Sequence, residues 1–141
     1  MKTAEELGDI WIASTKDVEN WTARFSEQLQ CKFEPSRRGV PRLYSKDNAL
    51  VIALMAGMVR GGAHARVAAV MAGAFLHSIK YSARKTLPRW IVFAAGDAKK
   101  CEWIETPNFS HLKKLFGSVT LSFVPARDLQ QRIDRIFEGH L

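Results

Sequence analysis

Cysteine is scarce in this chain: Cys31 and Cys101 are the only two among 141 residues. Neither belongs to a Cys-x-x-Cys pair or lies near a cluster of histidines, which excludes a zinc site built from them. A disulfide between them remains open, although a chain of this size does not need one and reduced thiols suit a cytoplasmic protein. The histidines are equally scattered, at positions 64, 77, 111 and 140. We therefore expect no metal and no other cofactor.

Long apolar runs and the signature motifs of enzymes are also missing. The longest apolar-rich run covers residues 49–59, far short of the roughly 20 residues that span a bilayer. The first residues, MKTAEELGD, are polar and acidic, so we expect no signal peptide, no membrane partner and a cytoplasmic location. The chain contains no GxSxG, P-loop, GxGxxG or HExxH motif, and we do not expect an enzyme.

Acidic residues are too few to balance the basic ones. The chain has 14 Asp and Glu against 21 Lys and Arg, a net charge of +7, and its hydrophobic content of 47% is enough for a packed core. Such a charge favours a polyanionic partner, nucleic acid before an anionic membrane surface. A basic protein without any nucleic-acid role stays open as the alternative. Residues 32–46 concentrate the charge, with five basic residues and one acidic residue.

The first thirty residues predict two short helices separated by a polar turn. Thr3 and Glu6 have the spacing of a capping box at the start of a helix over residues 3–13. Ser14-Thr15 breaks the apolar pattern, and a second helix is expected over residues 16–29. Its inward face is formed by Val18, Trp21 and Phe25. Two such helices are typical of a helix-turn-helix.

A basic, non-helical segment follows and leads into two further helices. Three breakers interrupt residues 33–44, and Gly39 stands where the tip of a tight hairpin is expected. Ser45 is suited to cap a helix that ends at Gly61-Gly62. Residues 64–77 predict a helix rich in alanine. The inward residues expected in these two helices are Leu50, Leu54 and Met58, then Val67, Val70, Met71 and Phe75.

The pattern changes after residue 78. Strands are expected over residues 89–95, 100–105 and 119–124, with the turn 96–98 between the first two. A short helix over residues 110–116 closes at Gly117, and an amphipathic helix covers residues 126–138. Strand 119–124 is a candidate for a two-fold interface. The C-terminal part is thus expected to pack on itself, to pair with a second copy, or to bind another protein.

The order of the N-terminal elements resembles the DNA-binding domain of the MerR family of transcription regulators. The resemblance covers residues 10–75 and is carried by VPRLYS at 40–45, similar to the family's wing-to-helix junction, and by LMAGMVRGG at 54–62. It implies a winged helix-turn-helix at residues 1–78. The β-β-α-β-α pattern at 79–141 resembles no known family and is expected to form a module for dimerisation or sensing, so that the whole fold is expected to be α+β. The glycine between the first two helices of the family and its long dimer helix have no counterpart here.

The candidate DNA-binding residues lie on the second helix and in the basic segment. Residues at i, i+4 and i+8 of the helix face away from its apolar side and suit base edges in the major groove. The arginines of the segment suit phosphates or the minor groove, and the resemblance implies that the tyrosine donates its hydroxyl to a phosphate. A plain solvated helix face, and a tyrosine at the edge of the core, are the open alternatives. The candidates are Thr15, Lys16, Asn20, Arg24, Arg37, Arg38, Arg42 and Tyr44.

From these residues we expect a sequence-specific, double-stranded DNA-binding transcription regulator. A second copy of the chain is an expected partner because one helix-turn-helix reads only a half-site, and RNA polymerase is a further candidate partner. Two other classes remain open. One is a DNA-architectural or excisionase-like recombination accessory protein, and the other is an interaction adaptor or antitoxin that does not bind DNA.

Overall fold

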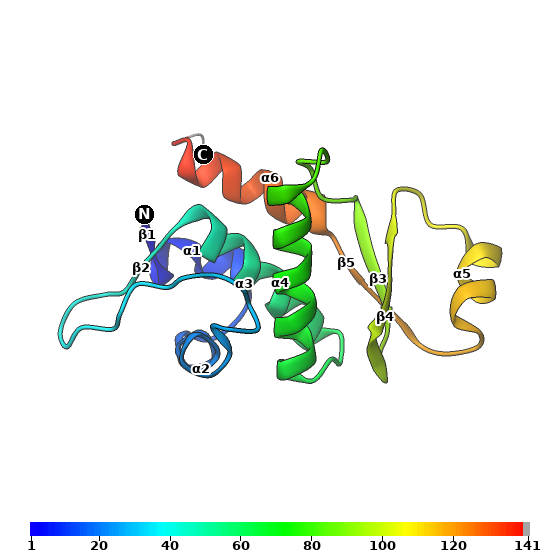
Figure 1. Ribbon diagram of the computed structural model, residues 1–141, viewed down its shortest axis with the longest axis horizontal. Helices are drawn as coiled ribbons and strands as arrows, with labels where there is room; N and C mark the ends of the chain where they lie inside the picture. Colours follow the sequence, from blue (N-terminus) through cyan, green and yellow to red (C-terminus); the bar gives the residue numbers. More distant parts are fainter. Residues whose placement is uncertain (140–141) are drawn as a thin grey trace.

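The computed structural model describes residues 1–139 of the chain (Figure 1). The fold is α+β: within these residues, six helices accompany two small antiparallel sheets. The helices are α1 (Ala4–Trp11), α2 (Thr15–Phe25), α3 (Lys46–Arg60), α4 (Ala65–Tyr81), α5 (Phe109–Phe116) and α6 (Ala126–Phe137). The strands are β1 (Lys2–Thr3), β2 (Leu43–Tyr44), β3 (Trp90–Ala94), β4 (Asp97–Ile104) and β5 (Leu121–Val124).

The helix starts follow the capping signals of the sequence. Thr3 and Glu6 form the predicted capping box at α1. Ser45 caps α3 as predicted, and Asn48 completes a second box by accepting from the Ser45 backbone N–H at 3.1 Å. Because these side chains satisfy backbone N–H groups that have no partner within the helix, both starts are fixed locally.

Several boundaries differ from the prediction. The second helix ends at Phe25 instead of continuing to residue 29, and residues 26–30 form turns. These turns finish at Gln30, which has a φ of 53° and so cannot continue a right-handed helix. Strand β4 begins at Asp97, inside the predicted turn, because Ala94 pairs with Asp97 after a shift in register.

Helix α3 is the centre of the molecule. The predicted inward residues Leu50, Leu54 and Met58 are buried, and so is almost every other side chain from Asn48 to Met58. Helices α1, α4 and α6 and strand β5 all pack against it. A helix that is apolar on every side is expected in such a surrounded position.

The buried face of α4 differs from the predicted one. Phe75 is buried as predicted, but Val70 is 42% exposed. The first half of the buried face consists of Ala68, Ala69, Ala72 and Gly73, and the second half of Phe75, Leu76 and Ile79. Gly73 is its tightest point, where an added Cβ would lie 2.4 Å from the backbone oxygen of Gln28. The chain that follows α2 therefore approaches the helix closely at Gly73, where a residue without a Cβ is needed.

The larger sheet has the order β4-β3-β5 and separates the other helices from α5 (Figure 1). Alternate residues of β3 face opposite layers. Ile91 and Phe93 belong to the main core, whereas Val92 and Ala94 pack with residues of α5 in a smaller cluster. The main core also contains residues of β5 and α6. The main core thus contains residues from both predicted segments, 1–78 and 79–141.

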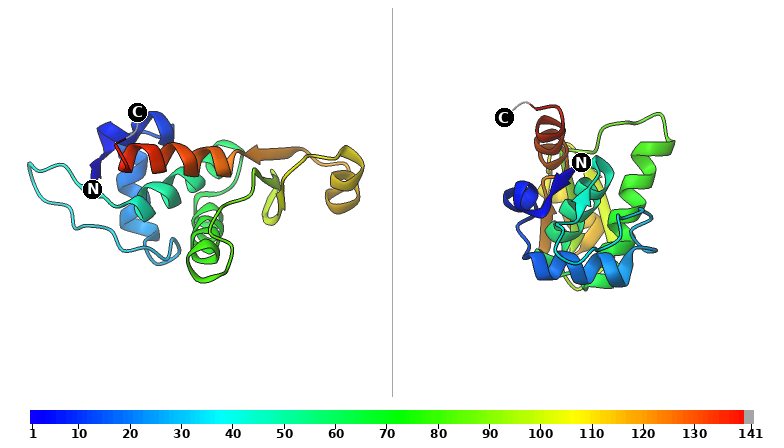
Figure 2. Two further views of the ribbon diagram at one scale, coloured as in Figure 1. Left: turned by 90° about the horizontal axis from the view of Figure 1, so that it is seen from above. Right: turned by 90° about the vertical axis from the view of Figure 1, so that its left-hand side faces the viewer.

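The molecule is elongated, with the segment between α2 and β2 projecting at one end and α5 lying at the other (Figure 2). Across residues 1–139, no helix is both long and apolar enough to cross a membrane.

Candidate nucleic-acid interface

Helix α2 is positioned by a tight turn after α1. Ile12 ends α1 in the left-handed region, with a φ of 49°, and its N–H bonds to the Gly8 carbonyl at 3.1 Å. Ser14 then caps α2 by accepting from the Asp17 N–H at 3.0 Å. The turn is therefore built without the glycine that the MerR family places here.

The inward face of α2 is the predicted one. Val18, Trp21 and Phe25 are buried. The opposite face exposes Lys16, Asn20 and Arg24, as the spacing predicts. Thr15, in the first turn, is exposed as well. These four candidate residues are accessible to a ligand, and their contact with DNA stays a prediction.

The basic segment is a loop, which we call the basic loop and define as residues 31–42. Its tip is a tight turn in which the Val40 N–H donates to the Arg37 carbonyl at 3.2 Å and Gly39 has a φ of 76°. The glycine therefore lies at the tip, as predicted. The hairpin is reduced to a single bridge between Arg37 and Val40. Arg37 and Arg38 are exposed at this tip.

Arg42 and Tyr44 are not presented to solvent with the other candidates. The Arg42 guanidinium lies 3.3 Å from a carboxylate oxygen of Glu19 and also donates to the Thr22 hydroxyl. The Tyr44 hydroxyl donates to Glu19 at 3.4 Å. Both side chains thus attach the end of the basic loop to α2, and Glu19 accepts from both.

Tyr44 is part of the core, with 1% of its surface exposed. Its ring meets Trp11 edge-on at a centroid distance of 4.8 Å. The Trp11 indole N–H in turn donates to the Ala49 carbonyl at 3.0 Å. Burial raises the pKa of Tyr44 to about 12, and the negative charge of Glu19 acts in the same direction. The hydroxyl is therefore a neutral donor to Glu19 at physiological pH.

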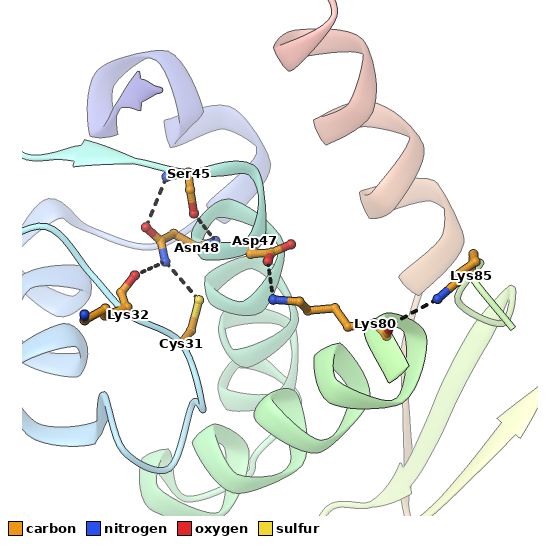
Figure 3. A network of polar contacts seen from close by, with 7 residues as sticks. All are labelled: Cys31, Lys32, Ser45, Asp47, Asn48, Lys80 and Lys85. Carbon is orange, nitrogen blue, oxygen red and sulfur yellow. Dashed lines mark hydrogen bonds and ion pairs between the residues drawn. The ribbon is translucent and has the colours of Figure 1, made fainter. Parts of the chain in front are cut away.

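The start of the basic loop is attached to α3 by a buried amide (Figure 3). The Asn48 amide nitrogen donates to the Lys32 carbonyl at 2.8 Å and to the Cys31 sulfur at 2.9 Å. Burial raises the pKa of Cys31, so its thiol stays protonated at neutral pH. Since Asn48 also closes the capping box with Ser45, one side chain fixes both the helix start and the loop base.

An ion pair continues this network toward α4. Asp47 in the first turn of α3 lies 2.9 Å from the Lys80 ammonium, near the end of α4 (Figure 3). The Lys80 carbonyl accepts from Lys85 at 3.0 Å. The side chains of Asp47 and Lys80 are exposed, so their ion pair contributes little to stability. They place the end of α4 beside the base of the basic loop.

Sequence reasoning missed the residues that position the interface. Glu19, Thr22 and Asn48 were not among the candidates. The capping spacing from Ser45 to Asn48 was a usable signal for the amide. No local signal identifies Glu19 and Thr22, because their partner Arg42 is about twenty residues away and is brought to them only by the fold.

The structure brings six candidates to the surface, namely Thr15, Lys16, Asn20, Arg24, Arg37 and Arg38. The described residues hold no group of three His, Cys, Asp or Glu side chains placed to bind a metal ion. Cys31 and Cys101 are free. The surface therefore offers hydrogen-bond donors and positive charge to a ligand.

No protein-family model matches this chain, and no curated protein matches it either.

Proposed function

We propose that this protein is a sequence-specific regulator of transcription that binds double-stranded DNA through a MerR-like winged helix-turn-helix. In this proposal α1 and α2 form the helix-turn-helix and the basic loop is its wing. The observation that carries it is the exposed row Lys16, Asn20 and Arg24 on α2, at the end of the molecule from which the basic loop projects (Figure 2).

The dimensions and chemistry of α2 suit the major groove. Its 11 residues give a rod about 16 Å long, and the groove is about 12 Å wide and admits one helix. Asn20 suits the paired donor and acceptor of adenine, and Arg24 suits the two acceptors of guanine. These two residues would therefore select sequence, while Lys16 and Thr15 would contact the backbone near the start of the helix.

The basic loop suits the phosphate backbone. Arg37 and Arg38 are exposed beside the turn at Gly39, and both ends of the loop are attached to helices. A tip that is fixed at its base loses less conformational entropy on binding than a free segment. Pairing with Arg42 also offsets the charge of Glu19, the acidic residue of α2 that faces the basic loop.

A binding assay with matched variants tests the proposal. Fluorescence anisotropy with random duplex DNA is measured across a series of salt concentrations for the wild type, for Arg37→Ala/Arg38→Ala and for Lys99→Ala/Lys100→Ala. Lys99 and Lys100 are exposed on β4, remote from the basic loop, and their loss removes the same charge. The slope of log affinity against log salt is negative. We expect the arginine variant to reduce its magnitude by about 1.8, and the lysine variant to change it little.

The proposal fails if no duplex is bound even at low salt, or if the two double variants weaken binding equally. Recognition of a specific DNA sequence is tested by a second measurement, in which the protein enriches sites from a randomised duplex library. Asn20→Ala should reduce the preference for the enriched site while leaving binding to random DNA unchanged, because only phosphate contacts persist there. Binding without any enriched site would favour the architectural class of protein over a regulator.

A further inference from the structure

Strand β5 is an edge of the larger sheet with backbone groups free to pair. Among residues 1–139 it pairs with β3 alone. The Thr120 carbonyl accepts from the Ala95 N–H at 3.1 Å, so Thr120 directs its backbone groups toward β3. Since these directions alternate along a strand, Ser122 and Val124 also face β3. The N–H and C=O groups of Leu121 and Phe123 therefore face outward.

The two edges of this sheet differ in charge. The β4 edge carries Asp97, Lys99, Lys100 and Glu102, and charged side chains are the usual protection of an edge strand against pairing. Residues 117–125, GSVTLSFVP, contain no charged residue. The β5 edge thus lacks the protection that the β4 edge has, and pairing it with an identical strand opposes no like charges within the strand itself.

Exposed apolar side chains accompany the free edge. Val119 is 52% exposed, Phe123 is 42% exposed and Phe109, at the start of α5, is 81% exposed. Leu121 and Phe123 are two residues apart in β5, so they share one face of the strand, and Val119 lies in the bend just before it. With Phe109 and Leu112 they line a surface hollow of about 440 Å³. Apolar exposure of this kind next to an open edge marks an interaction surface.

We propose that a second copy of this chain covers this surface, with the two β5 strands paired antiparallel about a two-fold axis at Ser122. In this register the outward backbone groups of Leu121 and of Phe123 in the other copy exchange both hydrogen bonds. The side chains of this pair meet on the α5 face, as aromatic and aliphatic cross-strand neighbours do. The two sheets become one continuous sheet, and the contact is the same for both copies.

An unrelated peptide strand is the competing occupant. It would need only the outward backbone groups and one pocket. The uncharged strand favours an identical strand as its partner. This pairing satisfies the outward backbone N–H and C=O groups of both copies at once and leaves neither edge open. The consequence for DNA reading rests on the function proposed above, while the pairing itself is tested without DNA.

Sedimentation equilibrium of the full chain provides the test. We expect the wild type to be dimeric at micromolar concentration and Phe123→Lys to raise the dissociation constant at least about 100-fold, because it places a charge in the apolar contact. Val70→Lys is the matched control, since Val70 is also 42% exposed but lies on α4. It should remain dimeric. Circular dichroism checks that each variant is folded.

Val119→Lys is the second variant in case Phe123→Lys does not fold, and the same loss of dimer is expected from it. A wild type that stays monomeric at about 100 µM would overturn the proposal, because this concentration is well above the dissociation constant expected of a specific complex. So would a folded lysine variant at either position that dimerises like the control. Failure of DNA binding is read separately, from the Arg37→Ala/Arg38→Ala series, so the two proposals can fail independently.

Discussion

Arg42 and Glu19 form an ion pair whose two partners are unequally buried, so we expect their replacements to reduce stability by different amounts. Their side chains are 11% and 39% exposed, respectively. Glu19→Gln would leave a permanently charged, largely buried guanidinium without its counter-charge. Breaking a fully buried pair costs about 3–5 kcal/mol, and the partial access of water here reduces the expected loss to about 2 kcal/mol.

The reverse change should cost less. Arg42→Met keeps the packing of the side-chain stem and leaves a carboxylate that water and the Tyr44 hydroxyl can still solvate. We expect a loss of about 1 kcal/mol. The double variant should cost about 1.5 kcal/mol, because a neutral amide then faces a neutral thioether. The cycle therefore predicts a coupling of about 1.5 kcal/mol between the two residues.

Urea unfolding measures all four proteins of this cycle. Tryptophan fluorescence is a suitable signal, since Trp11 and Trp21 are both buried. The reasoning is refuted if Arg42→Met costs more than Glu19→Gln, or if the coupling is below about 0.3 kcal/mol, the usual additivity error.

Arg42→Met also distinguishes between two roles of Arg42, positioning of the basic loop and contact with a phosphate. If DNA is bound as proposed, Arg37→Ala should reduce the magnitude of the slope of log affinity against log salt by about 0.9. Arg42→Met should leave this slope unchanged. An equal decrease for Arg42→Met would show that Arg42 leaves Glu19 to bind a phosphate.

Three further outcomes follow from packing and burial. Gly73→Ala should destabilise the fold by about 1–3 kcal/mol in urea unfolding, because its Cβ would lie 2.4 Å from a backbone oxygen, whereas Gly8→Ala, with no atom within 4 Å, should gain about 0.5–1 kcal/mol. The pKa of Tyr44 is raised to about 12. Its contribution to stability is therefore complete below pH about 10 and is lost as the pH rises toward 12. Ultraviolet titration of the phenolate should give a higher pKa in the folded protein than in urea. Burial raises the pKa of Cys101 to about 11 and also raises that of Cys31, so both thiols should react slowly with a disulfide reagent at pH 8 compared with the unfolded chain.

Local signals predicted the helices well. Capping spacing located the starts of α1 and α3, and the apolar period located the buried face of α2. Both signals depend on residues within one or two turns, so they succeed where no distant segment decides which face is buried. The expectation failed for Val70, where the close approach of another segment at Gly73 decides which face of α4 is buried.

The interface was predictable only in part, for a related reason. The exposed face of α2 follows from its period, and the exposed tip of the basic loop follows from its turn residues. Arg42 and Tyr44 lie two residues apart in the same basic segment and gave the same signal. Their inward position depends on Glu19, a partner more than twenty residues away, and on the pairing of β2 with β1.

The proposed DNA-reading helix α2, the recognition helix, and the proposed dimer edge at β5 are connected by packing and by hydrogen bonds at both ends of α3. Helix α3 is joined to the basic loop through Asn48 at its start and to β5 at its end, where the Ser122 hydroxyl donates to the Gly61 carbonyl at 2.7 Å. The resemblance to MerR regulators implies a long helix that separates the two halves of a dimer, and residues 1–139 contain no such helix after α4. Here the separation between two recognition helices would be set by the core around α3. Neither helix could move toward the other without disrupting that core, so the spacing of half-sites would be fixed by the fold.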